Sequence, residues 1–276
     1  SGFLQSGFSF GFLLAAISFQ IITIAFPGDM FGEIGWRILF FTGIIPGFVA
    51  LFVRISMDES PLWIKKNKES GLERTPLRSI VFGIHRKEFL LCAAIMTGLV
   101  YMYHGSISIL PTYLEQFGNF DKRQIALIMI YATASSWVGM ILTGWLSQKI
   151  GRKKSMLVFV SASILVSIPL ASTILENAYG LVVYVVMFAF VISTASGPIP
   201  AYFSERFPTQ IRNSAAGFSY NAGLLFGSWS PLIALSLMSY VPKQMIPVAL
   251  GINIIIGAII VIIPTLLSRE TKDIDL

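Results

Sequence analysis

Long stretches without a charged side chain constrain this chain more than any other feature of its sequence. Residues Ser155 to Leu175 contain no acidic or basic side chain, and neither do residues Asn177 to Ser204. A helix of about 20 apolar residues is long enough to cross the hydrocarbon core of a bilayer. Because lipid offers the backbone no hydrogen bonds, such a segment must satisfy its own N–H and C=O groups, as a helix does. Both stretches therefore predict transmembrane helices.

The rest of the chain has the same character. Apolar residues make up 55% of the 276 residues and charged residues only 12%, about half of the roughly 25% typical of soluble domains. This composition excludes an ordinary soluble domain and predicts an all-α membrane protein. We expect about eight transmembrane helices, at residues 2–26, 36–56, 88–110, 123–147, 155–175, 179–203, 212–238 and 244–267.

Lysine and arginine are distributed unevenly among the connections between these helices. One alternate set of connections holds 16 of the 20 basic residues and the other set holds four. Basic loops stay in the cytoplasm, so this pattern predicts a multi-pass protein of the cell membrane with both chain ends cytoplasmic. The net charge of +6 then reflects orientation in the lipid bilayer, and no nucleic acid partner is expected.

The longest connection, residues 57–87, is predicted to be a cytoplasmic linker. It separates residues 1–56, the last two helices of an N-terminal half, from residues 88–276, a C-terminal half of six helices. Ser60 can cap a short helix that has Pro61 at its first position. The apolar run Leu62–Ile64, followed by Lys65 and Lys66, suits the membrane interface.

The first two predicted helices resemble the last two. Gly2-Phe3 and Gly217-Phe218 begin similar glycine- and phenylalanine-rich helices, 215 residues apart, and acidic residues follow the second and the eighth helix 211 residues apart. Parallel repeats of this kind occur in transporters. If the protein consists of two six-helix repeats, the first four helices of the first repeat are missing from this sequence.

Several motifs resemble those of the major facilitator superfamily. The first is Gly144-Trp-Leu-Ser-Gln-Lys-Ile-Gly-Arg-Lys-Lys154, which is similar to a cytoplasmic loop signature of the family. The second is Glu205-Arg-Phe-Pro-Thr209 with Arg212. The family's helices five and six are resembled by three further stretches, which are the opening residues, Gly35-Trp36-Arg37 and Asp58-Glu59-Ser60-Pro61. Within the family, the chain looks most like the sialic-acid/proton and lactate-type carboxylate/proton symporters. The resemblance implies a helical bundle in which this chain supplies helices five to twelve.

The same resemblance implies which residues stabilise a closed cytoplasmic gate. These residues are Glu59, Gly144, Gly151, Arg152, Glu205 and Arg212. One departure is that Gln148 stands where the family's loop signature usually has an aspartate, which puts this half's charged cluster in doubt.

Polar residues inside membrane helices are costly and are therefore the best functional pointers. On the third predicted helix, Tyr101 and His104 belong to a polar stripe with helical spacing that also includes Thr97, Ser108 and Pro111. The candidate residues for substrate binding or a proton pathway are Gln5, Ser9, Tyr101, His104, Tyr131, Asn221 and Ser228. Small and hydroxyl residues also mediate helix packing in membranes, so a purely structural role is the alternative.

His104 is the one titratable group inside a predicted span whose ordinary pKa, roughly 6.5, lies near neutrality. It could contribute to proton binding or hydrogen-bond a solute. Alternatively, it is a neutral buried histidine paired with a neighbouring hydroxyl group.

The sequence lacks the motifs of enzymes that use nucleotides or metals. There is no P-loop, the single cysteine is Cys92, and no metal-ligand partner accompanies His104 at helical spacing. We expect no enzyme activity, no cofactor and no metal site. We expect a secondary active transporter that moves a small organic solute by alternating access and is coupled to protons. A carboxylate is favoured as the solute over a sugar. The alternatives are a non-transporting membrane fragment with a structural role and an intramembrane enzyme acting on lipid.

Overall fold

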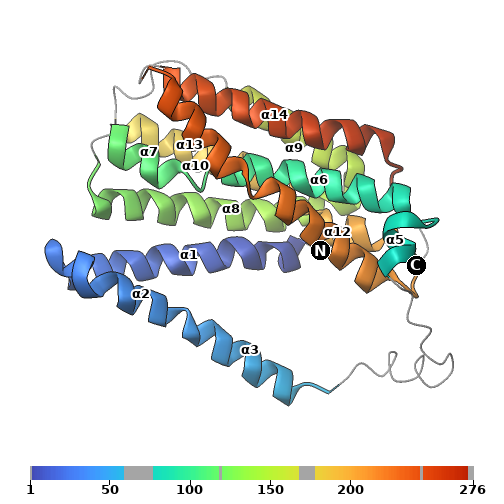
Figure 1. Cartoon of the computed structure of the whole chain (residues 1–276), viewed down its shortest axis with the longest axis horizontal. Coiled ribbons are helices and arrows are strands. Elements are labelled where there is room, and N and C mark those ends of the chain that lie inside the picture. The colour runs from blue at the N-terminus through green and yellow to red at the C-terminus, as the bar shows by residue number, and fades with distance from the viewer. Residues whose placement is uncertain (1, 59–76, 118–119, 168–177, 243–244, 273–276) are drawn as a thin grey trace.

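A computed structural model describes residues 2–58, 77–117, 120–167, 178–242 and 245–272, which form helices and turns (Figure 1). The helices of the first part are α1 (Gly2–Ala25), the π-helical turn η1 (Phe31–Gly35), α2 (Trp36–Thr42) and α3 (Ile44–Ser56). Those that follow are α5 (Leu77–Phe82), α6 (Arg86–His104), α7 (Leu110–Phe117), α8 (Lys122–Ile150), α9 (Arg152–Ser167), α10 (Ala178–Thr194), α11 (Ile199–Ser204), α12 (Arg212–Gly227), α13 (Ser230–Tyr240) and α14 (Ile246–Leu267).

Six helical segments of the described chain are long and apolar enough to cross a membrane. They are Gly2–Ala25, Phe31–Ser56, Lys122–Ile150, Gly180–Ser204, Arg212–Tyr240 and Val248–Leu267. The other two predicted spans correspond to α6, which starts with three charged residues, and to α9, which is described for 16 residues only. The prediction of an all-α membrane bundle is confirmed.

Four of the predicted spans are interrupted helices, and the first break, at Gly43, separates α2 from α3 in the span predicted at 36–56. The span predicted at 88–110 ends at His104, and a turn through Gly105 leads into α7. A third break precedes α11, where Pro198 is the N-cap residue, and a fourth separates α12 from α13, which has Pro231 in its first turn. Proline lacks the N–H that would continue the helical hydrogen bonds, which explains the last two breaks.

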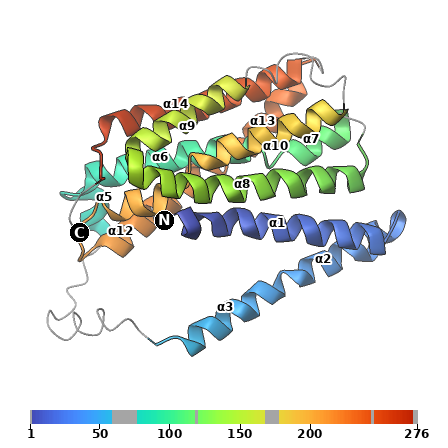
Figure 2. The ribbon, with the colours of Figure 1, turned by 180° about the vertical axis from the view of Figure 1, so that it is seen from behind.

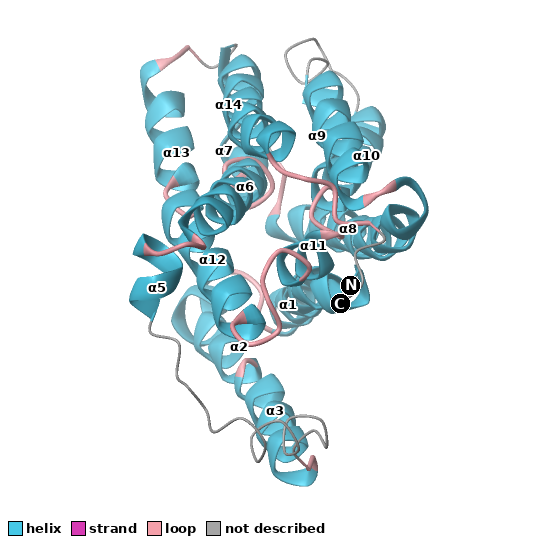
Figure 3. Cartoon of the chain, turned by 90° about the vertical axis from the view of Figure 1, so that its right-hand side faces the viewer, coloured by secondary structure: helices cyan, strands magenta, loops and turns pink. Residues whose placement is uncertain are grey.

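The helices pack into a bundle whose two ends differ. Figure 1 and Figure 2 show α1 beside α8 along most of its length, and Figure 3, seen along the bundle, shows α6 next to α12 and α14. The N-terminal start of α1 and the C-terminal residues lie at the same end. We call this the basic end, because Arg86, Arg152, Lys153, Arg206 and Arg269 lie there.

The pair α1 and α2–α3 and the pair α12–α13 and α14 have similar shapes. In Figure 1 both pairs are joined at the end opposite the basic end and spread apart toward it. This is the arrangement expected if the two pairs are repeats of each other. Each pair returns the chain to the side on which it started.

Helices α2 and α3 are exposed on all sides in this chain. None of their residues is buried, and large apolar side chains such as Phe40, Phe48, Phe52 and Ile55 are more than 60% exposed. In water so much apolar surface would be unfavourable, whereas a bilayer solvates it. Their exposure therefore agrees with a position inside the membrane.

Small and hydroxyl residues allow the helices to approach closely. A Cβ atom placed on Gly2 would lie 2.7 Å from the Cα atom of Gly144, so α1 and α8 can cross here only because both residues are glycine. Between α8 and α10, Ser135 donates a hydrogen bond to the Val186 carbonyl at 2.9 Å, and Ser193 donates one to Ser136 at 2.8 Å. These serines have the packing role that was the alternative to a functional one.

Candidate functional site

A central cavity of about 40 Å³ lies between α1 and the helices of residues 88–276. Four helices and one helix break supply the walls opposite α1, and no lining residue is an aspartate, glutamate, lysine or arginine. The lining residues are Gln5, Phe8, Met96, Leu99, Val100, Tyr103, His104, Met140, Ile192, Ser196, Tyr220 and Leu224.

A second cavity, which we call the opposite-end cavity, has about 530 Å³ of space and lies between α1, η1, α7 and α8. It is lined mainly by apolar residues, among them Phe12, Phe19 and Phe31, with Glu115 and Lys122 also in its lining. The Lys122 ammonium lies 5.1 Å from the centre of the Phe31 ring, a cation–π distance. This cavity is on the far side of the molecule from the basic end.

An aromatic cluster of Phe8, Phe12, Tyr103 and His104 separates the two cavities. The ring centroids of Phe8 and Phe12 are 5.1 Å apart, and those of Phe8 and Tyr103 are 5.5 Å apart at 69°. Phe8, Tyr103 and His104 line the central cavity, whereas Phe12 lines the opposite-end cavity. Edge-to-face contacts of this kind stabilise aromatic pairs beyond simple burial.

His104 stands at the end of α6 and is held by a hydrogen bond. Its Nδ1 atom lies 2.9 Å from the Ser108 hydroxyl, and Ser108 lines the opposite-end cavity. The contact matches the predicted alternative of a histidine paired with a neighbouring hydroxyl group. It leaves Nε2 as the ring nitrogen that this hydrogen bond does not use.

A buried asparagine on α14 holds the helix break that follows His104. The Asn253 Nδ2 group donates to the Gly105 carbonyl at 3.0 Å, and Asn253 is 1% exposed. A carbonyl at a helix end needs such a partner, because no backbone N–H reaches it. Asn253 thus fixes the point at which α6 stops and the orientation of the cavity residues just before it.

The structure brings some of the predicted solute-binding residues together. Gln5 and His104 both line the central cavity, on α1 and α6. Ser9 is fully buried one turn after Gln5, and its hydroxyl contacts the sulfur of the cavity residue Met140 at 3.3 Å. Tyr101 is buried, but it is not among the residues that line this cavity.

The other three predicted residues lie elsewhere. Tyr131 is 58% exposed on the outer surface of α8. Asn221 and Ser228 lie together on an open groove beside Trp229, and Asn221 donates only to the Gly217 carbonyl of its own helix, at 2.8 Å. These residues do not contribute to the central cavity as the described chain forms it.

Sequence analysis missed several cavity residues. Tyr103 was passed over in favour of Tyr101, and Met96, Met140 and Tyr220 were not considered. A signal existed, because Met96, Val100 and Tyr103 follow one another at steps of four and three, the spacing of one helical face. This face carries fewer polar residues than the stripe through Tyr101.

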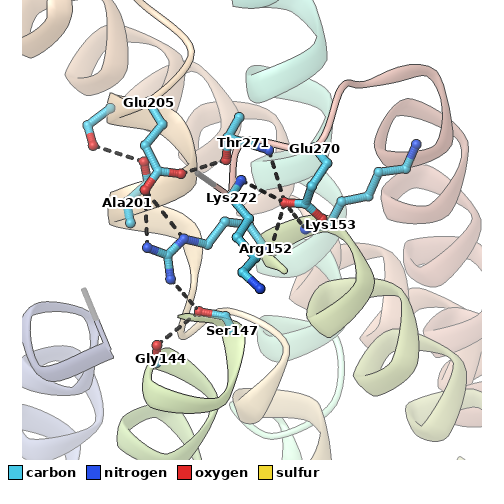
Figure 4. A network of polar contacts seen from close by, with 10 residues as sticks. Gly144, Ser147, Arg152, Lys153, Ala201, Glu205, Glu270, Thr271 and Lys272 are labelled. Atoms are coloured by element: carbon cyan, nitrogen blue, oxygen red, sulfur yellow. Dashed lines mark hydrogen bonds and ion pairs between the residues drawn. The ribbon is translucent and has the colours of Figure 1, made fainter. Parts of the chain in front are cut away.

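The basic end holds a network of charged and polar groups (Figure 4). Arg152 forms an ion pair with Glu205 at 3.1 Å and donates from Nη1 to the Ser147 hydroxyl at 2.9 Å. The second carboxylate oxygen of Glu205 accepts a hydrogen bond from the Thr271 hydroxyl at 2.5 Å. The ion pair joins the start of α9 to the end of α11 although Gln148 replaces the usual acid, which answers the doubt about this cluster.

Glu270 caps the first turn of α9. Its carboxylate accepts hydrogen bonds from the backbone N–H groups of Arg152, at 2.8 Å, and of Lys153, at 3.1 Å (Figure 4). Burial favours the protonated form, but N–H groups of Thr271, Lys272, Lys153 and Arg152 outweigh it and lower the pKa of Glu270 below its ordinary value.

The capping is reciprocal between the two helices. Lys153 donates from Nζ to the carbonyls of Leu266, at 2.8 Å, and Ser268, at 2.9 Å, at the end of α14. Glu270 therefore satisfies the start of α9 while Lys153 satisfies the end of α14. Both contacts also complement the helix dipoles.

Gly151 makes this arrangement possible. Its φ of 105° lies in the region that favours glycine, and a Cβ atom there would lie 2.6 Å from a carboxylate oxygen of Glu270. The resemblance predicted Gly151 as part of the gate. The structure gives it a physical reason, since only glycine allows both the turn and the approach of Glu270.

A second ion pair at the basic end was not foreseen. The Arg206 side chain is 1% exposed, and its Nη2 group pairs with the Glu88 carboxylate in the first turn of α6. Its Nη1 group donates to the Tyr202 hydroxyl at 2.9 Å and to the Arg269 carbonyl at 3.3 Å. Arg206 thus connects α6, α11 and the residues after α14.

Two of the predicted gate residues stand apart from these networks. Arg212 bonds only locally, to the Phe207 carbonyl and the Thr209 hydroxyl, both at 3.4 Å. Glu59, like Ser60 and Pro61, lies outside the residues that the structure describes. As for metals, no three His, Cys, Asp or Glu side chains of the described residues come together as ligands.

Comparison with known proteins identifies the family. The sequence profile described as "Major Facilitator Superfamily" matches residues 1–231. The chain is 32% identical to the sialic acid transporter NanX of Escherichia coli (strain K12), over 87% of this chain and 56% of that protein. It is 27% identical to a cis,cis-muconate transport protein of Acinetobacter baylyi, over 83% of this chain and 55% of the relative.

The fold agrees with a solved transporter structure. A D-xylose-proton symporter superimposes with a TM-score of 0.64 at 20% sequence identity, over 92% of this chain and 60% of the other. The chain spans about half the length of the curated relatives it matches. By its sequence profile and its fold, this integral membrane chain belongs to the major facilitator superfamily of transporters.

Proposed function

We propose that this chain acts in secondary active transport of a small organic solute by alternating access, coupled to protons. The observation that carries the proposal is the central cavity, which lies between α1 and the helices of residues 88–276. The proposed halves, residues 1–56 and 88–276 joined by the linker 57–87, would move relative to each other around this cavity. Gln5 and Phe8 would contact the solute from one half and Tyr103 and His104 from the other.

The proposed orientation places the basic end in the cytoplasm. Both chain ends would then be cytoplasmic, as the distribution of lysine and arginine predicts. In this orientation the Arg152–Glu205 pair and the Glu270 cap would stabilise the state that is closed to the cytoplasm. Opening would require the groups that bridge α9, α11 and the residues after α14 to separate.

A carboxylate is the favoured solute class. The names of two relatives, a sialic acid transporter and a cis,cis-muconate transport protein, specify acids. The cavity offers hydrogen-bond donors for a carboxylate in Gln5, His104 and Tyr220. Since its lining residues include no lysine or arginine, protonation of His104 would supply the one positive charge there.

Uptake into liposomes tests the proposal. The purified chain, reconstituted in proteoliposomes, is expected to accumulate radiolabelled muconate when the lumen is made alkaline, and a protonophore is expected to abolish the accumulation. Uptake no greater than in empty liposomes would contradict transport by this chain. Saturable binding without uptake would assign it a non-transporting role instead.

The contribution of His104 has its own test. Replacing His104 with alanine is expected to remove the dependence of uptake on external pH and to weaken solute affinity. His85→Ala is the matched control, because His85 lies before α6 and lines neither cavity. Unchanged pH dependence and affinity in His104→Ala would exclude His104 from proton coupling and from solute binding.

A further inference from the structure

We propose that the opposite-end cavity holds one acyl chain of a membrane phospholipid, with the lipid's headgroup bound at the rim by Lys122 and Glu115. The chemistry that fits is a phospholipid whose headgroup carries both a phosphate and a primary amine. This lipid site is separate from the central cavity and does not depend on the proposed transport. It follows from the size, the lining and the charges of the opposite-end cavity.

The opposite-end cavity is long enough for an acyl chain. Its space of about 530 Å³ extends along α8, where the lining residues run from Lys122 in the first turn to Thr133, 11 residues later. Because a helix rises 1.5 Å per residue, the cavity reaches about 16 Å along this helix. One leaflet contributes half of the hydrocarbon core, which is about 30 Å thick. The cavity therefore matches the length of an acyl chain in one leaflet.

Small side chains leave this space open between α1 and α8. Ala15 and Ala16 line it from α1, and Ala126 lines it from α8. Another wall is aromatic, since the rings of Phe19 and Phe31 meet edge-on with their centroids 5.5 Å apart. A larger side chain in place of one of the alanines would fill the gap between the two helices.

The deep part of the cavity suits a hydrocarbon chain. Of the 15 lining residues, 11 are apolar. The hydroxyl groups of the deep part are already hydrogen-bonded, since Thr133 donates to the Met129 carbonyl at 2.7 Å and Ser108 lies 2.9 Å from His104 Nδ1. A polar solute would lose its hydrogen bonds to water there, whereas an acyl chain has none to lose and gains apolar contact.

The rim carries one charge of each sign. Lys122 begins α8 and Glu115 lies in the last turn of α7, at the end of the bundle where the headgroups of one leaflet lie. Neither side chain forms an ion pair with another of the described residues, and the Lys122 ammonium faces the Phe31 ring. A lysine binds phosphate as a point charge, and a carboxylate accepts hydrogen bonds from an amine. A headgroup with both groups offers a partner to each residue.

Lipid also lies next to the cavity. Leu39 of α2 is one of the lining residues, and the neighbouring Phe40 and Phe41 are 76% and 67% exposed. Because the bilayer solvates this exposed surface, phospholipid surrounds the same helix that forms part of the wall. The proposed occupant is thus present at the cavity wherever the chain is embedded in a membrane.

Native mass spectrometry of the purified full chain, delipidated in detergent and titrated with defined lipids, tests the headgroup contacts. Phosphatidylethanolamine should bind at least about fivefold more tightly than phosphatidylcholine with the same acyl chains, because the choline group has no N–H to donate. Lys122→Gln should weaken phosphatidylethanolamine binding by about tenfold, the effect of losing one charge-assisted hydrogen bond. Arg123→Gln is the matched control, since Arg123 is an exposed neighbour that does not line the cavity, and it should leave binding unchanged.

Photolabelling locates the acyl chain. Phosphatidylethanolamine with a diazirine in one acyl chain should label residues 12–19 of α1 and residues 125–133 of α8 when the chain is irradiated in nanodiscs. Ala16→Trp fills the cavity and should abolish this labelling. Ala50→Trp, on the exposed surface of α3, is the control and should leave it unchanged.

Each part of the proposal has its own contrary result. Phosphatidylcholine binding as tight as phosphatidylethanolamine binding would overturn the headgroup class. Unchanged affinity in Lys122→Gln, which alters an exposed residue and should fold normally, would overturn the role of Lys122. Labelling confined to α2 and α3, or unchanged in Ala16→Trp, would show that the acyl chain does not enter the cavity. Lipid binding is measured without solute uptake, so these results are separate from the test of transport.

Discussion

The central cavity and the basic end differ in the charge of their side chains and in how far their polar groups are hydrogen-bonded within the protein. At the basic end, Arg152, Glu205 and Glu270 are each held by two or more hydrogen bonds or ion pairs. In the cavity no lining residue has a permanent charge, and the Tyr103 hydroxyl has no partner within the described chain. The difference is one of polarity: the charged groups of the basic end are paired within the protein, whereas the cavity is lined by apolar and uncharged polar side chains.

The largest expected effect comes from breaking the buried ion pair of the basic end. Glu88→Ala leaves the Arg206 guanidinium buried without its counter-charge, which should lower the free energy of unfolding by about 3 kcal/mol. Unfolding in mixed micelles with increasing SDS measures it. Glu115→Ala, at an exposed acid of the opposite end, is the control and should change stability little. Equal effects of the two would show that the pair contributes nothing specific.

Gly151→Ala should have the next largest effect. A side chain at a φ of 105° costs about 1–3 kcal/mol, and the new Cβ would push against Glu270. Gly217→Ala is the matched control, because a Cβ there meets nothing within 4 Å in a helical position. The same SDS titration should show a lower free energy of unfolding for Gly151→Ala and an unchanged or slightly higher one for Gly217→Ala. A tolerated alanine at 151 would refute the capping geometry.

Asn253→Leu tests the boundary between the two regions. It removes the donor to the Gly105 carbonyl, which should lower the free energy of unfolding by about 1 kcal/mol. Because the helix break after His104 would also lose its support, the free energy of solute binding should fall by more than the free energy of unfolding does. Asn221→Leu, which loses only a bond within its own helix, is the control. Stability loss with unchanged affinity would limit Asn253 to a structural role.

The smallest effect should appear as a dependence on pH. The pKa of Glu270 is lower in the folded protein than its ordinary value of 4.5, so its contribution is present above that value. It is lost as the pH falls through the folded-state pKa. The unfolding temperature should decline on acidification, and less so in Glu270→Gln, where no carboxylate titrates. Parallel declines in both proteins would assign the effect to other carboxylates.

The general architecture could be predicted because the bilayer restricts the alternatives so strongly. A charge-free run such as Ser155 to Leu175 has no stable structure in lipid except a helix. The helix break after His104 could not be predicted in the same way. The Gly105 carbonyl at the end of α6 is satisfied by Asn253, 148 residues later, and local sequence does not contain that information.

The candidate site was predicted only in part for a related reason. Gln5 and His104 stand out as polar residues in apolar helices, and both line the cavity. Tyr101 and Tyr103 look equivalent in sequence, and which one faces the cavity depends on the rotation of α6 in its packing against α12 and α14. Tyr131, Asn221 and Ser228 are polar residues on exposed surfaces, which periodicity alone does not distinguish from cavity positions.

The reciprocal capping of α9 and α14 has a consequence for biogenesis. Arg152 emerges from the ribosome 118 residues before Glu270, so α9 enters the membrane while the acceptor for its first N–H groups has not yet been synthesised. Until then its amino end must be hydrated or held by another factor. A ribosome stalled before residue 270 would therefore carry a nascent chain in which the contact between α9 and the residues after α14 has not yet formed.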